Sequence, residues 1–264
     1  MKLSLLLLMF IFSFSYAATD LDFKNLRQIV ENEYNPIFIS ELGSPLKIEL
    51  DEDSPNYVGG IDFRNGIYSI QLGSDFEKEE GITIDSYAAI LCHEIGHALG
   101  GLPKKINSNN GEISWSSTEA QSDYFSSTIC LKKIFKIIPS ENSNLMIPEN
   151  IRKDCEVAFT KSNSDDDKKI CMRTALAGYE LMTYLFQLFS KYGGPQKYNY
   201  KPELTQKELS NESSKNLYPN LQCRLDTIVA GALCVEQKND FQDGFCEKAE
   251  GYTIGLRPSC WYVD

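Results

Sequence analysis

The chain has few basic residues, few histidines and no closely spaced cysteine pair. Lysine and arginine together number 26 against 37 aspartate and glutamate residues. Such an acidic surface repels nucleic acid and anionic membranes, so we expect no nucleic-acid partner. No two cysteines have CxxC spacing, which argues against a zinc ribbon and against a thioredoxin-type redox site. The sequence also has no internal repeat and no low-complexity tract.

The first 17 residues are typical of a secretory signal peptide. Lys2 forms a positive n-region, and residues 3–15 form an apolar region that is too short to span a bilayer. Small residues at Ser15 and Ala17 predict cleavage near Ala17. No later segment is apolar enough for a membrane-spanning helix, so we expect no stable membrane insertion. The sequence therefore predicts a protein exported to the periplasm or the extracellular space.

The chain contains eight cysteines. An even number after a signal peptide favours disulfides over metal or redox chemistry. Cys155 and Cys171 form the simplest local pair. Cys92 is either a buried thiol or the partner of Cys130, and we favour the disulfide. The last four are expected to pair among themselves: Cys223, Cys234, Cys246 and Cys260.

The first half of the chain predicts one helix, three strands and then two helices. Helical spacing predicts a helix over 20–33, and the next apolar segment reads as a short strand over 45–50. Two apolar runs flank Asn65-Gly66, which predicts a hairpin because both residues tolerate positive φ. The first of the two later helices is expected to begin near Asp85 and to end at Gly100 and Gly101. The second is expected to span 116–135, and a polar loop over 104–114 separates the two.

The second half predicts mainly helices. We expect an acidic turn over 163–169, a long helix over 170–192, a surface excursion over 195–216 and a helix followed by a cysteine-rich tail. A calcium loop is the alternative for the acidic turn, but its spacing does not match an EF-hand. Strands early and helices late predict an α+β fold with a small, mostly antiparallel sheet. We expect one domain over 18–264, comprising a metal-site core (18–135) and a helical, disulfide-containing part (136–264).

Both histidines belong to one motif, "HEIGH", at 93–97. On a helix, His93 and His97 project from one face, so both imidazoles can reach one cation, and Glu94 lies beside them. HExxH on a helix is the zinc metallopeptidase motif, with two ligands and a general base. The alternative is two surface histidines, which is disfavoured because the surrounding run is apolar nearly all round and buried polar groups need partners.

A catalytic zinc needs a third protein ligand. The extended pattern HExxHxxGxxH would place it at Pro103, which cannot bind metal, so the ligand is a carboxylate or, less favourably, a cysteine. Glu119 is the best candidate because it opens the next helix, where Asp123, one turn later, can accept from a ligand imidazole N–H. Glu112, in the polar loop, is the alternative ligand.

The segments "HEIGH" and "TEAQSDYF" resemble the HExGH…ExxxD pattern of the gluzincin metallopeptidases. The closest resemblance is to the CAAX prenyl endopeptidases and their soluble exported relatives, and it covers about residues 85–130. It implies a gluzincin-like fold and one Zn²⁺ per chain, with Glu119 as the third ligand and Asp123 supporting the site.

A later segment, "YPNLQCR", resembles the HP…R segment of the same family, with a tyrosine in place of the histidine. The resemblance implies that Tyr218 and Arg224 stabilise the developing oxyanion. A phenol is a competent donor for this role.

We therefore expect an exported zinc-dependent endopeptidase that acts on a peptide or protein substrate. Glu94 would take a proton from a zinc-bound water that attacks the peptide carbonyl. The run 67–72 is expected to be an edge strand, either one to which the substrate adds or a plain structural edge. The alternatives are a secreted zinc-binding chaperone or interaction module with little hydrolytic activity, and a disulfide-stapled binding protein without metal. No oligomeric state is assigned.

Overall fold

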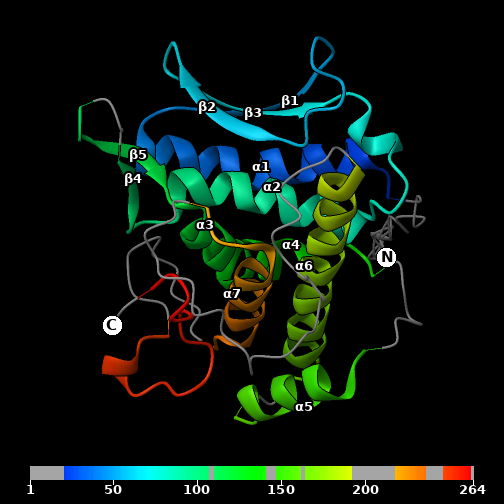
Figure 1. The fold of residues 1–264 in the computed structure, drawn as a ribbon, viewed down its shortest axis with the longest axis vertical. Coiled ribbons are helices and arrows are strands. Elements are labelled where there is room, and N and C mark those ends of the chain that lie inside the picture. Colours follow the sequence, from blue (N-terminus) through cyan, green and yellow to red (C-terminus); the bar gives the residue numbers. More distant parts are fainter. Residues whose placement is uncertain are drawn as a thin grey trace, which may run out of the picture.

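A small sheet covers one side of a group of helices (Figure 1). The computed structural model describes residues 21–106, 110–140, 147–161, 164–191, 218–235 and 246–262. These residues form the predicted α+β fold. The predicted signal peptide (1–17) and the surface excursion (195–216) lie outside the described residues.

The main sheet has three strands in the order β1-β3-β2, with β1 at Leu46–Asp51, β2 at Gly60–Arg64 and β3 at Ile67–Gly73. The predicted hairpin joins β2 to β3, where Asn65 and Gly66 have φ angles of 54° and 76°. β1 and β3 pair in parallel, and this pairing was not predicted. Because β3 has a neighbour on each side, residues 67–72 are not an edge strand, and that prediction is wrong.

Helix α1 (Phe23–Leu42) packs beneath this sheet and is longer than predicted. Its N-cap is Asp22, whose side chain accepts from Asn25 N–H. The helix continues past residue 33 because Tyr34 and Phe38 extend the buried apolar stripe. It ends at Gly43, whose left-handed φ of 68° suits glycine.

Helix α2 (Ile84–Leu99) runs through the centre of the structure, and every residue in it except Asp85 is buried. The helix begins near Asp85, as predicted, and its N-cap is Thr83. Thr83 and Ser86 form a reciprocal capping box. Asp85 instead forms two hydrogen bonds with Arg173, from Nε (2.9 Å) and Nη2 (2.7 Å).

The second predicted helix is present as three successive helical segments: α3 (Glu119–Phe125), a π-helical turn (Ser126–Cys130) and α4 (Leu131–Phe135). The segment before it, predicted as a loop, forms a hairpin of β4 (Lys104–Ile106) and β5 (Ile113–Ser117). Its strands are short and their isoleucines are exposed, so no alternating pattern marks them in the sequence.

The C-terminal part is helical, as predicted. Helix α6 (Asp165–Lys191) begins inside the predicted acidic turn, because three aspartates in its first turn favour a helix N-terminus. Helix α7 (Leu221–Leu233) packs against α6 and α3. Helix α5 (Glu149–Ala158) was not predicted. Short 3₁₀ turns lie at Phe76–Lys78 and Lys248–Glu250.

Four disulfides join the described residues. Cys92–Cys130 and Cys155–Cys171 confirm the predicted pairs, and the last four cysteines pair as Cys223–Cys260 and Cys234–Cys246. They indicate folding in an oxidising, exported environment. Among the residues that the structure describes, no helix combines the length and apolar character needed to cross a membrane.

Helices α2 and α3 approach closely at Gly96. A Cβ atom there would lie 2.7 Å from the carbonyl oxygen of Ser122 and 2.9 Å from its Cα. We expect Gly96→Ala to lower the free energy of unfolding by about 1–3 kcal/mol, measured by urea denaturation, because the backbone of α3 must move. Alanine at an unconstrained helical position would raise it by about 1 kcal/mol, so an increase would contradict this close contact.

Candidate metal centre

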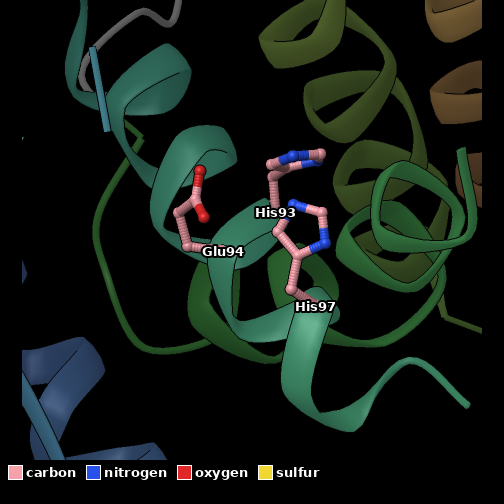
Figure 2. Close-up of side chains that lie close together, drawn as sticks. All are labelled: His93, Glu94 and His97. Atoms are coloured by element: carbon pink, nitrogen blue, oxygen red, sulfur yellow. The ribbon is translucent and has the colours of Figure 1, made fainter. Parts of the chain in front are cut away.

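The two histidines and Glu94 meet on one stretch of α2. Figure 2 shows the rings of His93 and His97 on one side of the helix, with the Glu94 carboxylate beside them. One potential ligand atom from each of the three residues lies within 4.8 Å of the others, so the group could hold a metal ion. All three side chains are buried. Buried polar groups of this kind need partners, which a metal ion would provide.

Glu119, at the start of α3, brings a second carboxylate to the imidazoles. Its Oε2 lies 3.2 Å from His93 Nε2, and its Oε1 lies 3.6 Å from His97 Nε2. Bonds of about 2.0–2.1 Å in a tetrahedral zinc site place neighbouring ligand atoms about 3.3 Å apart. These separations therefore fit a metal ion between Glu119 and the two imidazoles.

The other nitrogen of each imidazole is already occupied. His93 Nδ1 lies 2.7 Å from Asp123 Oδ1. His97 Nδ1 lies 2.9 Å from the carbonyl oxygen of Ser117, at the end of β5, and 2.8 Å from Ser122 Oγ. An Nδ1–H that donates to an oxygen leaves the Nε2 lone pair free for a metal. Both rings are therefore oriented as ligands.

Arg224, on α7, reaches the same buried carboxylate. Its Nε donates to Asp123 Oδ2 at 2.7 Å, and its Nη2 donates to Oδ1 at 2.9 Å. The Arg224 guanidinium also lies 5.5 Å from the centre of the Tyr218 ring. The structure thus brings both Tyr218 and Arg224 to the site. The hydrogen bonds of Arg224 described here go to Asp123.

The charges at the site follow from these contacts. Burial alone would lower the pKa of His93, but the Asp123 carboxylate outweighs it and raises this pKa to about 9. Burial and the neighbouring His93 lower the pKa of His97 to about 3. The pKa of Glu119 is lowered despite its burial, because His93 bonds to it. Burial raises the pKa of Glu94, so its carboxylate accepts a proton more readily than an exposed one.

Sequence reasoning missed several neighbours of these residues. Lys105, on β4, donates from Nζ to Glu119 Oε1 at 2.8 Å. Ser117 and Ser122 anchor His97, as described above. The contacts of Lys105 and Ser117 depend on the unpredicted hairpin, whereas Ser122 lies on α3. Glu112, the alternative ligand, is exposed and accepts from Asn110 instead.

Comparisons with models of protein families, with curated proteins and with solved structures found no match for this chain. The assignment of a function therefore rests on the geometry of the site.

We expect Glu119→Gln to abolish stoichiometric zinc binding, because a neutral amide is a much poorer ligand than a carboxylate. The measurement is the metal content of the zinc-loaded, dialysed protein by mass spectrometry. Glu112→Gln is the matched control, and it should keep about one zinc ion per chain. Loss of zinc in Glu112→Gln with retention in Glu119→Gln would reverse the assignment.

We also expect zinc binding to release a proton from His93. Its pKa of about 9 keeps the metal-free imidazole charged at neutral pH, and a ligand must be neutral. In the metal-free protein, the pair of charged His93 with Asp123 stabilises the folded state. This contribution is complete below the pKa of 6.5 that His93 has in the unfolded chain, and it is lost as the pH rises through the folded-state pKa of about 9. Zinc affinity should therefore increase with pH over this window.

The measurement is a zinc titration at pH 7.5 in weak buffer with a pH indicator. The wild type should release about one proton more than Asp123→Asn, in which the pKa of His93 falls. Equal release from both proteins would contradict the proposed pair.

Proposed function

We propose that the protein is an exported zinc-dependent endopeptidase of the gluzincin type. One observation carries the proposal: both imidazole Nε2 atoms face the Glu119 carboxylate at separations of 3.2 and 3.6 Å. Two imidazoles and a carboxylate are the His₂Glu donor set of catalytic zinc sites, which keep a fourth position open. When bound, zinc acts as a Lewis acid and lowers the pKa of water towards about 7.

Glu94 is the general base in this proposal. Its carboxylate lies beside the imidazoles but is not needed as a ligand when Glu119 takes that place. Burial raises its pKa and so makes the carboxylate a stronger proton acceptor. Glu94 would take a proton from the attacking water at a carboxylate oxygen and return it to the leaving amine.

The remaining residues would position the ligands and the substrate. Asp123 holds His93 through Nδ1, and Arg224 holds Asp123. Tyr218, 59 % exposed beside Arg224, offers its O–H to the oxygen on which charge develops.

A peptide substrate that binds as an added strand must pair with an outer strand of the sheet. β3 is the central strand, so it is not available, whereas β2 is an outer strand. The preceding Gly59 packs against Ile90 of α2, where an added Cβ would lie 3.3 Å from the isoleucine Cγ2. We propose that an extended peptide adds along β2.

A zinc-binding module with little hydrolytic activity is the second candidate. The bond from Lys105 to Glu119 favours it, because it places a cation from the β4–β5 hairpin on the proposed third ligand. An interaction module would bind zinc at the same residues and leave casein intact.

Glu94→Gln distinguishes these candidates. The variant should keep about one zinc ion per chain, because the ligands are untouched, and should lose activity on casein by about 100-fold or more, because the base is gone. Glu80→Gln, on the exposed surface, is a control that should leave both readouts unchanged. Equal activity of Glu94→Gln and the wild type would contradict the proposed base, and a zinc-loaded wild type without activity would favour the interaction module.

A further inference from the structure

Tyr57 lies in the loop between β1 and β2, and its backbone is held firmly. Its N–H donates to the carbonyl oxygen of Ser54 at 3.0 Å, and its carbonyl oxygen accepts from Gly73 N–H at 2.8 Å. A Cβ at Gly73 would lie 2.6 Å from both Tyr57 N and Tyr57 O. Glycine at position 73 therefore allows the loop to pack directly on the end of β3.

The tyrosine side chain is placed by a second glycine. A Cβ at Gly60 would lie 2.0 Å from the Tyr57 hydroxyl oxygen, so any larger residue there would displace the phenol. The neighbouring Gly59 packs on Ile90 of α2. Ile90 precedes Glu94 by one helical turn and shares its face. The loop therefore lies over the Glu94 side of α2.

The electrostatics of Tyr57 agree with this position. After burial, the largest influence that raises the pKa of Tyr57 is the charge of Glu94, followed by Tyr218 and Glu119. The phenol thus stays protonated and can donate a hydrogen bond. The residue is 45 % exposed, so part of it is open to solvent.

A site that stabilises a developing oxyanion can use more than one donor. Arg224 already gives two hydrogen bonds to the buried Asp123. Tyr218 is an accessible phenol beside Arg224, and Tyr57 reaches the site from a different element of the fold. Two phenols from separate loops could therefore contact one substrate.

We propose that Tyr57 is a catalytic residue whose phenol O–H donates a hydrogen bond to the substrate carbonyl oxygen as that oxygen gains negative charge. This inference rests on the proposed peptidase function and adds a donor to it. Gly60 is a positioning residue, because its missing side chain leaves room for the hydroxyl.

The test compares Tyr57→Phe, Gly60→Ala and the double variant with the zinc-loaded wild type. Tyr179→Phe, on α6, is the control for loss of a phenol hydroxyl outside the site. The readouts are kcat and KM on fluorescent casein, the Kd of an N-phosphoryl dipeptide that mimics the tetrahedral transition state, and zinc content.

We expect Tyr57→Phe to lower kcat and weaken phosphoryl-dipeptide binding by about 10- to 100-fold, with KM changed by less than about twofold. Zinc content should not change. Gly60→Ala should lower kcat in the same direction and add little to Tyr57→Phe, because both remove the same hydrogen bond. Tyr179→Phe should match the wild type.

Wild-type kcat and phosphoryl-dipeptide affinity in Tyr57→Phe would overturn the role of Tyr57 while leaving the proposed function intact. If Tyr57→Phe fails to fold, an unaltered kcat in folded Gly60→Ala would overturn it equally. A zinc-loaded wild type that neither cleaves casein nor binds the phosphoryl dipeptide would overturn the proposed function, and the role of Tyr57 with it.

Discussion

The hydrogen bonds of the buried Asp123 carboxylate hold the site together. Asp123 is fully buried, and it accepts from Arg224 Nε and Nη2 while facing His93 Nδ1 at 2.7 Å. A carboxylate removed from water is destabilising by several kcal/mol unless it is paired. Its partners come from α2 and α7, so satisfying one charge on α3 fixes the positions of three helices. His93 is oriented by the same contact.

Two further features keep α2 and α3 in register around this carboxylate. The Cys92–Cys130 disulfide joins the residue before His93 to the end of the π-helical turn that follows α3. Gly96 allows the backbones to touch at Ser122, the residue before Asp123. The disulfide lies directly before the HEIGH motif (93–97), and the contact between Gly96 and Ser122 lies near the end of the motif. Together they keep α3, with Glu119, against the His97 part of α2. A site built between two packed helices in this way is more rigid than one on loops.

The parts of the site that follow from local periodicity could be predicted from the sequence. His93 and His97 share a face because they are one turn apart, and Asp123 follows Glu119 by one turn on the next helix. The Asn65-Gly66 hairpin and the local Cys155–Cys171 disulfide are likewise short-range features. The parts that depend on tertiary packing could not be predicted. The parallel pairing of β1 with β3, the place of Lys105 and the position of Tyr57 all depend on segments that meet only in the folded chain.

The most direct test of the central claim is zinc K-edge X-ray absorption of the zinc-loaded protein. A His₂Glu site predicts nitrogen and oxygen neighbours at about 2.0–2.1 Å, with the multiple-scattering signature of about two imidazoles and no sulfur. Glu119→Gln should lose this spectrum. Sulfur scattering at about 2.3 Å, or a spectrum without imidazole features, would contradict a metal centre built from His93, His97 and Glu119.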